Sequence, residues 1–146
     1  MNDIIKNFKF SAPIHLRWSD LDPIGHVNNV IYFDYFQDSR GLYMLQASKN
    51  WDWHKNMFLI AHIEADYLSE LRFDHKNPKV WIRTTKFGIK SFDLEYLVTS
   101  EHKGETKIHA KGKSVQVLID LTQKKTIEVP DWLKQDIQEF EGLESL

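Results

Sequence analysis

Apolar side chains crowd one stretch of the chain, Asn29 to Ala47, where they recur on several sides of a helical wheel. These residues are Val30, Ile31, Phe33, Tyr35, Phe36, Leu42, Met44 and Leu45. Because a helix that is apolar on most sides has to be covered on most sides, the pattern predicts a helix surrounded by other structure. Asn28 or Asn29 can serve as its N-cap, since a short amide side chain accepts hydrogen bonds from the N–H groups of a first helical turn.

The hydrophobic pattern changes to a period of two from Met57 onward, which is typical of β-strands. The alternating stretches read MFLIAHIEADYL, VWIRTTKF, SFDLEYLVTS and TKIHAKGKSVQVLID. Residues that favour turns separate them, namely Asn77-Pro78, Gly88 and Lys103-Gly104. A consecutive series of this kind predicts an antiparallel meander.

Two further elements flank this series. Lys9 to Trp18 is an alternating stretch that predicts a first strand, although Pro13 confines part of it to a sheet edge or to irregular structure. After Pro130, the stretch DWLKQDIQEF predicts a short amphipathic helix at about residues 130–141. No repeat, flexible linker or low-complexity tract interrupts the chain, so we expect a single domain over residues 1–146.

One long apolar helix and one antiparallel sheet can bury their apolar faces together only if the sheet curls around the helix. The sequence therefore predicts an α+β fold of the hotdog type, with an antiparallel sheet of about five to six strands around one central helix. A single copy would leave sheet edges and part of the helix open to solvent, so we expect a homodimer or homotetramer.

Composition and charge narrow the classes of function. The chain is 42% hydrophobic, 27% charged and 13% aromatic, which is typical of a packed globular core. Its formal net charge of -2 provides no basic field for phosphate, so we expect no nucleic-acid partner. The absence of cysteine excludes thiol nucleophiles and disulfides. No stretch approaches the ~20 apolar residues of a membrane span and no signal sequence is evident, so we expect no membrane insertion and a cytoplasmic location.

A polar cluster, RWSDLDPIGHVNN, lies directly before the apolar helix. With YLSELRF, a GIKSF turn and a long final strand, it resembles the hotdog-fold acyl-CoA thioesterases of the 4-hydroxybenzoyl-CoA thioesterase type, from Phe10 to Trp132. The most specific segment is D-x-D-x-x-G-H-V-N-N-x-x-Y, which also looks like the plant acyl-carrier-protein thioesterases. The plant enzymes carry an asparagine where this chain has Ile24, so a mechanism that needs that amide does not carry over.

The resemblance implies hydrolysis of acyl-CoA or acyl-carrier-protein thioesters to a free carboxylic acid and a thiol. The catalytic carboxylate of the family falls at Asp22 in this sequence. The backbone N–H that stabilises the oxyanion falls at Asn29, at the start of the predicted helix. No cofactor is implied, because coenzyme A is part of the substrate.

This chemistry also agrees with the residues taken by themselves. A thiolate leaving group has a thiol pKa of about 8.5, so its departure needs little assistance. One carboxylate, acting as nucleophile or as general base for water, and one oxyanion donor form a sufficient set. The N-terminus of a helix offers such a donor, because its N–H groups are unpaired and carry partial positive charge.

Several other residues near this segment are candidates for the site. His26 can orient the substrate, polarise the thioester carbonyl or hold Asp22, or it can fix the loop through hydrogen bonds. Asp20 alternates with Asp22 along the chain and is expected to make structural hydrogen bonds instead. The remaining candidates, all for substrate binding, are Gly25, Asn28, Tyr32, Glu64 and Ser91.

Three alternatives compete with a thioesterase. A hotdog enoyl-CoA hydratase would place its histidine five residues after the aspartate, but His26 follows Asp22 by four. A metal-dependent hydrolase would need several convergent ligands, and the sequence has no His-x-x-x-His or Glu-x-x-His pair, so we expect no metal. A noncatalytic acyl-CoA-binding hotdog protein is disfavoured by the intact Asp22 segment.

Overall fold

The computed structural model describes residues 3–143, which form two α-helices, two short 3-10 helices and five strands. The elements in chain order are η1 (Ile5–Asn7), β1 (Phe10–Pro13), η2 (Trp18–Asp20), α1 (Ile31–Ala47), β2 (Met57–Tyr67), β3 (Lys76–Phe87), β4 (Ser91–His102), β5 (Glu105–Ile119) and α2 (Asp131–Glu141). No helix within this range is long and apolar enough to cross a membrane.

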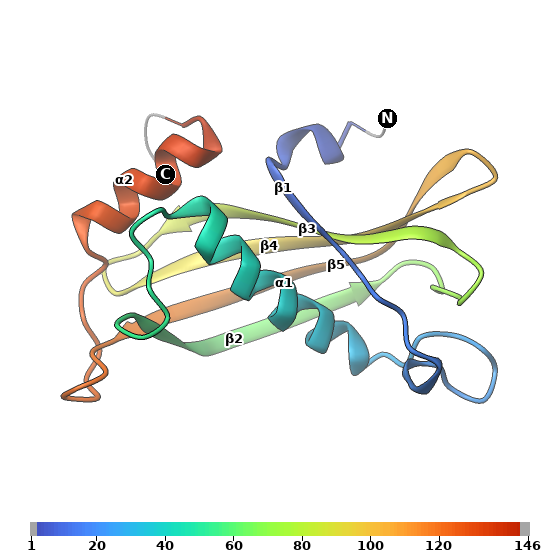
Figure 1. Cartoon of the computed structure of the whole chain (residues 1–146), viewed down its shortest axis with the longest axis horizontal. Helices are drawn as coiled ribbons and strands as arrows, with labels where there is room; N and C mark the ends of the chain where they lie inside the picture. Colours follow the sequence, from blue (N-terminus) through green and yellow to red (C-terminus); the bar gives the residue numbers. More distant parts are fainter. Residues whose placement is uncertain (1–2, 144–146) are drawn as a thin grey trace.

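The five strands form one antiparallel sheet in the order β1-β3-β4-β5-β2 (Figure 1). The meander predicted from the sequence is therefore correct for β3, β4 and β5 but wrong for β2, which pairs with β5 at the far edge. Residues 68–75 carry the chain from β2 to β3 on the other side of the sheet. The predicted turn at Asn77-Pro78 lies inside β3, at an irregularity of the ladder where Asn77 has a φ of 49°.

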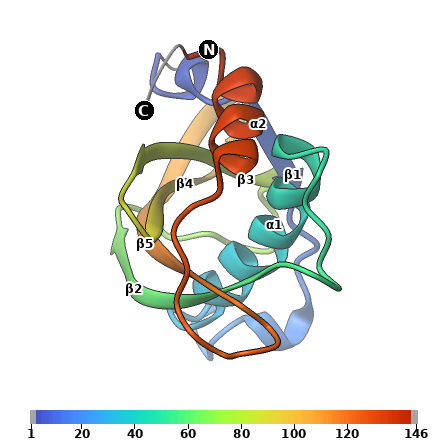
Figure 2. The same ribbon diagram turned by 90° about the vertical axis from the view of Figure 1, so that its left-hand side faces the viewer.

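Helix α1 lies against the concave face of the curled sheet, as the sequence predicted (Figure 2). Its buried residues recur at helical spacing: Tyr32, Tyr35, Phe36, Ser39, Arg40, Tyr43, Met44 and Ala47. Leu42 and Leu45 are about half exposed on the opposite side. The sheet therefore covers one broad face of the helix, and the expectation that α1 would be covered on most sides is not met within one protomer.

The helix and the sheet come into close contact at Phe36. Its ring stacks on that of Tyr96 in β4 at a centroid distance of 4.4 Å. A Cβ atom at Gly112 in β5 would lie 2.6 Å from the Phe36 ring, so only glycine leaves room for the ring at this position. This contact fixes α1, and with it the loop that precedes α1, relative to the sheet.

The N-terminal elements are shorter than predicted. Strand β1 ends at Pro13 instead of continuing to Trp18, because proline has no N–H to extend the ladder and the chain then turns into η2. Helix α1 begins at Ile31 with Val30 as its N-cap, two residues later than predicted. Asn28 forms the turn that leads into the helix: its carbonyl accepts from Ile31 N–H and its side-chain oxygen accepts from Val30 N–H.

The predicted C-terminal helix is confirmed as α2, and its last residue carries a buried acid. Glu141 is 7% exposed and accepts a hydrogen bond from Thr84 N–H at 3.2 Å. Burial disfavours the ionised form and raises the pKa of Glu141 to about 7 from 4.5, although the Thr84 bond opposes this. The native state consequently holds a proton on Glu141 over a pH range in which the unfolded chain has lost it.

We expect stability to fall as pH rises through this range. Between pH 4.5 and 7 the native state binds more protons at Glu141 than the unfolded state does, so the free energy of unfolding decreases by about 3 kcal/mol. Urea denaturation at a series of pH values would measure this decrease in the free energy of unfolding. Glu141→Gln should remove this contribution, whereas Glu139→Gln, at an exposed position of the same helix, should retain it. Equal pH slopes in the wild type and Glu141→Gln would contradict the assignment.

Candidate active site in the loop before the central helix

The loop from Asp20 to Asn28 folds back on itself as a short antiparallel pair. Leu21 and Val27 form a β-bridge, Asp22 N–H donates to the carbonyl of His26 at 2.8 Å, and Asn28 N–H donates to the carbonyl of Asp20 at 2.9 Å. Gly25 turns the chain with a φ of 82°, a conformation that residues with a Cβ seldom adopt. The turn itself therefore requires Gly25, whatever its relation to substrate.

The Asp22 carboxylate is held at one oxygen and free at the other. Its Oδ1 accepts backbone N–H bonds from Ile24 and His26, each at 3.0 Å. Its Oδ2 has no hydrogen-bond or ion-pair partner among residues 3–143. The side chain is partly exposed and lines a cavity of about 360 Å³ together with Trp18, Leu21, Pro23 and Gly25. A carboxylate fixed in this way presents one oxygen to a bound molecule.

Asp20 has the structural role that the sequence predicted. Its side chain is fully buried, accepting bonds from the N–H and side chain of Arg17 and from the Tyr35 hydroxyl at 2.8 Å. Burial opposes ionisation of Asp20, but the bonds from Arg17 and Tyr35 outweigh it, and the pKa is lowered. The anionic Asp20 thus ties the start of the loop to α1.

The imidazole of His26 is bonded to Glu70 and Arg72 and, among the described residues, makes no hydrogen bond to the Asp22 carboxylate. Its Nε2 lies 2.7 Å from Glu70 Oε2 and 3.0 Å from Arg72 Nη1, and Arg72 Nη1 donates to the other oxygen of Glu70. The hydrogen bond from Arg72 and the neighbouring His26 lower the pKa of Glu70. His26 holds Asp22 only through its backbone N–H, while its side chain and its β-bridge to Arg72 fasten the loop to the segment between β2 and β3.

Asn29 lies between this loop and the N-cap residue of α1. Among the hydrogen bonds of the described residues, none uses the backbone N–H of Asn29 as donor. Its carbonyl oxygen accepts a bond from the Tyr67 hydroxyl at 2.8 Å. An unpaired N–H thus stands in the turn that leads into α1, seven residues after Asp22, at the position the sequence predicted for an oxyanion donor.

The other predicted substrate-binding residues lie at different distances from this loop. Tyr32 is 3% exposed, and burial raises the pKa of its hydroxyl to about 12. Glu64 is exposed on β2, and its carboxylate contacts His62 at 3.2 Å. Ser91 pairs with Val117 of β5, and Val117 pairs with Leu59 near the start of β2. Asn29, in contrast, contacts Tyr67 at the opposite end of β2. One protomer therefore does not bring Ser91 to Asp22.

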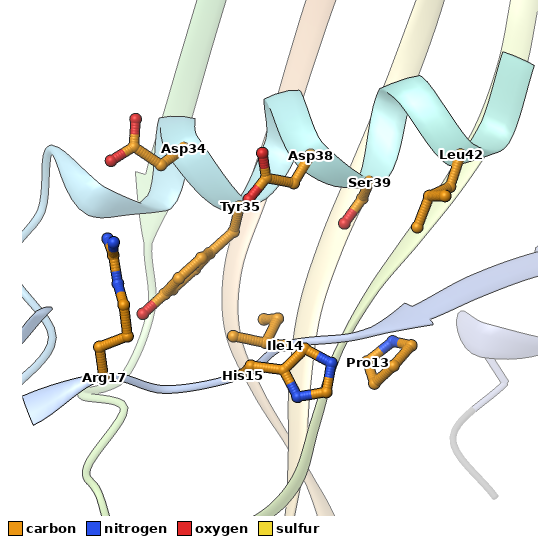
Figure 3. Close-up of a pocket in the computed structure, with 9 residues that line it drawn as sticks. All are labelled: Pro13, Ile14, His15, Arg17, Asp34, Tyr35, Asp38, Ser39 and Leu42. Carbon is orange, nitrogen blue, oxygen red and sulfur yellow. The ribbon is translucent and has the colours of Figure 1, made fainter.

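A larger cavity lies elsewhere, between α1 and the segment after β1 (Figure 3). It has a volume of about 530 Å³ and is lined by Pro13, Ile14, His15, Arg17, Asp34, Tyr35, Asp38, Ser39 and Leu42. Asp22 and Asn29 are not among these residues. We place the candidate site at the smaller cavity because Asp22, which lines it, keeps one carboxylate oxygen free. Asn29 lines neither cavity, but its unpaired N–H stands at the end of the loop that carries Asp22. Within residues 3–143, no three His, Asp or Glu side chains are grouped to hold a metal ion.

Sequence reasoning missed three residues that shape this site. Glu70 and Arg72 lie in the YLSELRF stretch, which contributed to the resemblance without any role for its charged residues. Tyr67 is the first residue of the same YLSELRF stretch and the last residue of β2, and it too contributed to the resemblance without being given a role. A strand tyrosine is normally assigned to packing, and its bond to Asn29 depends on how the strand end meets the loop.

The chain is similar to a known protein family, to a curated bacterial protein and to a solved thioesterase structure. Residues 16–137 match the Thioesterase-like superfamily. The chain is 29% identical over 91 residues to the uncharacterized protein YsmA of Bacillus subtilis (strain 168), a match that covers 62% of this chain and 61% of that protein, less than two thirds of its length. A thioesterase from Thermus thermophilus, solved with coenzyme A and Zn, is 30% identical with a TM-score of 0.80, covering 94% of this chain and 97% of that one.

A more distant solved structure shares the fold. A 4-hydroxybenzoyl CoA thioesterase mutant, solved with 4-hydroxybenzoyl CoA, superimposes with a TM-score of 0.77 at 15% identity, covering 88% of this chain and 97% of that one. At this identity the likeness concerns the fold alone, and it confirms the hotdog arrangement predicted from the sequence.

Proposed function

Since the chain belongs to the Thioesterase-like superfamily, we propose that it hydrolyses acyl-CoA or acyl-carrier-protein thioesters, with Asp22 and the backbone N–H of Asn29 as its catalytic groups. One observation carries this proposal: Asp22 keeps one oxygen free of any partner among the described residues, in a short loop that ends at an unpaired N–H. The superfamily and the coenzyme A bound to the Thermus thermophilus thioesterase support the substrate class.

Asp22 can act by either of two routes. As a nucleophile, Oδ2 attacks the thioester carbon, the C–S bond breaks, the thiolate leaves, and water then hydrolyses the acyl-aspartyl anhydride to the acid and Asp22. As a general base, Oδ2 removes a proton from water, which attacks the same carbon and displaces the thiolate. In both routes the carbonyl oxygen becomes anionic, and Asn29 N–H stabilises it by about 3 kcal/mol.

The rest of the loop supports these two groups. The backbone N–H groups of Ile24 and His26 fix the carboxylate, so less of the binding energy is needed to orient it. We assign His26 to holding the loop, because its imidazole contacts Glu70 and not the Asp22 carboxylate. Trp18 is 79% exposed at the cavity and offers an apolar surface to the acyl or pantetheine part of a thioester.

Release of free thiol from a panel of acyl-CoA and acyl-carrier-protein thioesters tests the proposed function. We expect turnover of at least one member well above its spontaneous hydrolysis. Tight binding without thiol release would favour the noncatalytic acyl-CoA-binding protein instead.

The working site is proposed to form in a homodimer joined at β2. This strand is an open edge of the sheet, and Leu59, at its start, is 58% exposed. Leu59 and Tyr67 lie eight positions apart, about 26 Å along a strand. Antiparallel pairing of two β2 edges would place the start of one β2 beside the end of the other. The end of the partner's sheet that carries Ser91, two strands in from that edge, would then lie on the same side of the dimer as Asn29.

Mixed dimers distinguish a shared site from a site within one protomer. We expect Ser91→Ala to lower kcat/KM about tenfold, because the proposed contact of the Ser91 hydroxyl with the substrate is lost. Co-expression of Asp22→Asn with Ser91→Ala chains should then restore about a quarter of wild-type activity, because half of the dimers carry one intact site. Activity no higher than that of the separate variants would contradict a shared site.

A further inference from the structure

Among the described residues, Tyr67 is the one side chain outside the loop that holds the backbone of Asn29. Tyr67 is the last residue of β2, and its hydroxyl donates a hydrogen bond of 2.8 Å to the Asn29 carbonyl. Its ring packs edge-on against the buried ring of Tyr32, with centroids 5.1 Å apart and planes at 66°. Leu68 N–H, one residue further, is bonded to the carbonyl of His109 in β5. The hydroxyl therefore reaches Asn29 from a position fixed by both packing and sheet pairing.

The two peptide groups on either side of the Asn29 Cα are anchored. In the preceding group, the Asn28 carbonyl accepts from Ile31 N–H at 3.0 Å. In the following group, the Asn29 carbonyl accepts from Tyr67 and Val30 N–H donates to Asn28 Oδ1 at 3.1 Å. Of the four polar backbone groups involved, only Asn29 N–H has no partner within residues 3–143.

Because a peptide group is planar, the Asn29 N–H turns with the Asn28 carbonyl that Ile31 N–H holds, whereas Tyr67 holds the next plane, which carries the Asn29 carbonyl. The two planes meet at the Asn29 Cα, so the two bonds together restrict rotation about this atom. A donor that is already oriented stabilises a developing oxyanion without reorganising during the reaction. Without the Tyr67 bond, the plane that follows Asn29 would be tied only through the exposed Asn28 side chain, and Asn29 could rock between conformations.

We propose that Tyr67 is a positioning residue: by holding the peptide plane that follows Asn29, its hydroxyl restricts the rotation about the Asn29 Cα that would reorient the N–H that receives the thioester oxyanion. This inference rests on the proposed function and goes beyond it by adding a residue from a different element. Within residues 3–143 the Tyr67 hydroxyl is bonded to the Asn29 carbonyl and not to Asp22, so we expect it to act through Asn29 and not on the substrate directly. Its effect is therefore exerted on the transition state and not on substrate affinity.

The test uses Tyr67→Phe, which removes only the hydroxyl and keeps the ring contact with Tyr32. We expect kcat to fall about tenfold with KM changed less than twofold, since the donor is misoriented and substrate binding is retained. Tyr43→Phe is the matched control. Tyr43 lies in the C-terminal half of α1 and its hydroxyl is bonded to Thr84 of β3, so removal of this hydroxyl should leave kcat within about twofold. Backbone ¹⁵N relaxation should show a lower order parameter at Asn29 in Tyr67→Phe and no change there in Tyr43→Phe.

The outcomes separate the two proposals. Wild-type protein without thioester turnover, or an Asp22→Asn variant that keeps full activity, would overturn the proposed function and this inference with it. If the wild type is active and Asp22→Asn is not, then a Tyr67→Phe variant with wild-type kcat and an unchanged order parameter at Asn29 would overturn the positioning role alone. An equal loss of kcat in Tyr43→Phe would also overturn it, by showing a general effect of the lost hydroxyl.

Discussion

Asp22→Asn should lower kcat for thioester hydrolysis by about 10³-fold while the protein remains folded. An amide oxygen can still accept the N–H bonds from Ile24 and His26, so the loop keeps its shape. The amide nitrogen that replaces Oδ2, however, neither attacks a thioester carbon nor removes a proton from water. Steady-state thiol release, with a thermal melt of each protein, would measure both properties.

Two variants make this result specific. Asp38→Asn makes the same change of charge in the cavity between α1 and β1, away from the proposed chemistry, and should leave kcat within about twofold. Asp22→Ala also removes the acceptor of the two N–H bonds, so it should lose activity and melt at a lower temperature than Asp22→Asn. Comparable activity of Asp22→Asn and Asp38→Asn would show that the carboxylate of Asp22 has no chemical role.

Asp20→Asn should reduce the free energy of unfolding by about 3 kcal/mol, a large share of what a domain of this size has. The buried carboxylate satisfies the Arg17 backbone N–H, the Arg17 guanidinium and the Tyr35 hydroxyl together. An amide has one acceptor oxygen and would direct an N–H at one of these donors. Equilibrium denaturation in urea at neutral pH would measure the loss.

The Asp20 carboxylate should also make the free energy of unfolding depend on pH under acidic conditions. Because the folded pKa of Asp20 is lowered, its contribution is present at neutral pH and is lost as pH falls through that pKa. Tyr35→Phe removes a single donor and should cost only about 1 kcal/mol, which provides the control. An Asp20→Asn protein within about 1 kcal/mol of the wild type would contradict the structural role of this residue.

Much of this fold could be predicted because the hydrophobic residues of its helices and strands recur with a clear period. The alternation after Met57 identified β2 to β5, and the apolar run before Ala47 identified α1. The place of β2 could not be predicted, because alternation shows which face of a strand is buried but not which strand is its neighbour. The two-residue error at the start of α1 has a local cause, since the side chain and carbonyl of Asn28 form a separate turn before the helix.

The candidate site was predictable only where its residues are close together in sequence. The segment from Asp20 to Asn29 could be interpreted from its motif, and the different surroundings of Asp20 and Asp22 agree with the unequal roles assigned to them. Glu70 and Tyr67 are remote in sequence and contact the loop through geometry that no local pattern encodes. The sequence does not distinguish a His26 side chain that faces Asp22 from one that faces Glu70.

A crystal structure with a nonhydrolysable acyl-CoA, in which a methylene group replaces the thioester sulfur, would test the central claim most directly. We predict that the ketone oxygen lies within about 3 Å of Asn29 N and that the carbonyl carbon lies about 3.5 Å from Asp22 Oδ2. A ketone bound away from both groups, for example in the cavity between α1 and the segment after β1, would contradict the proposed site.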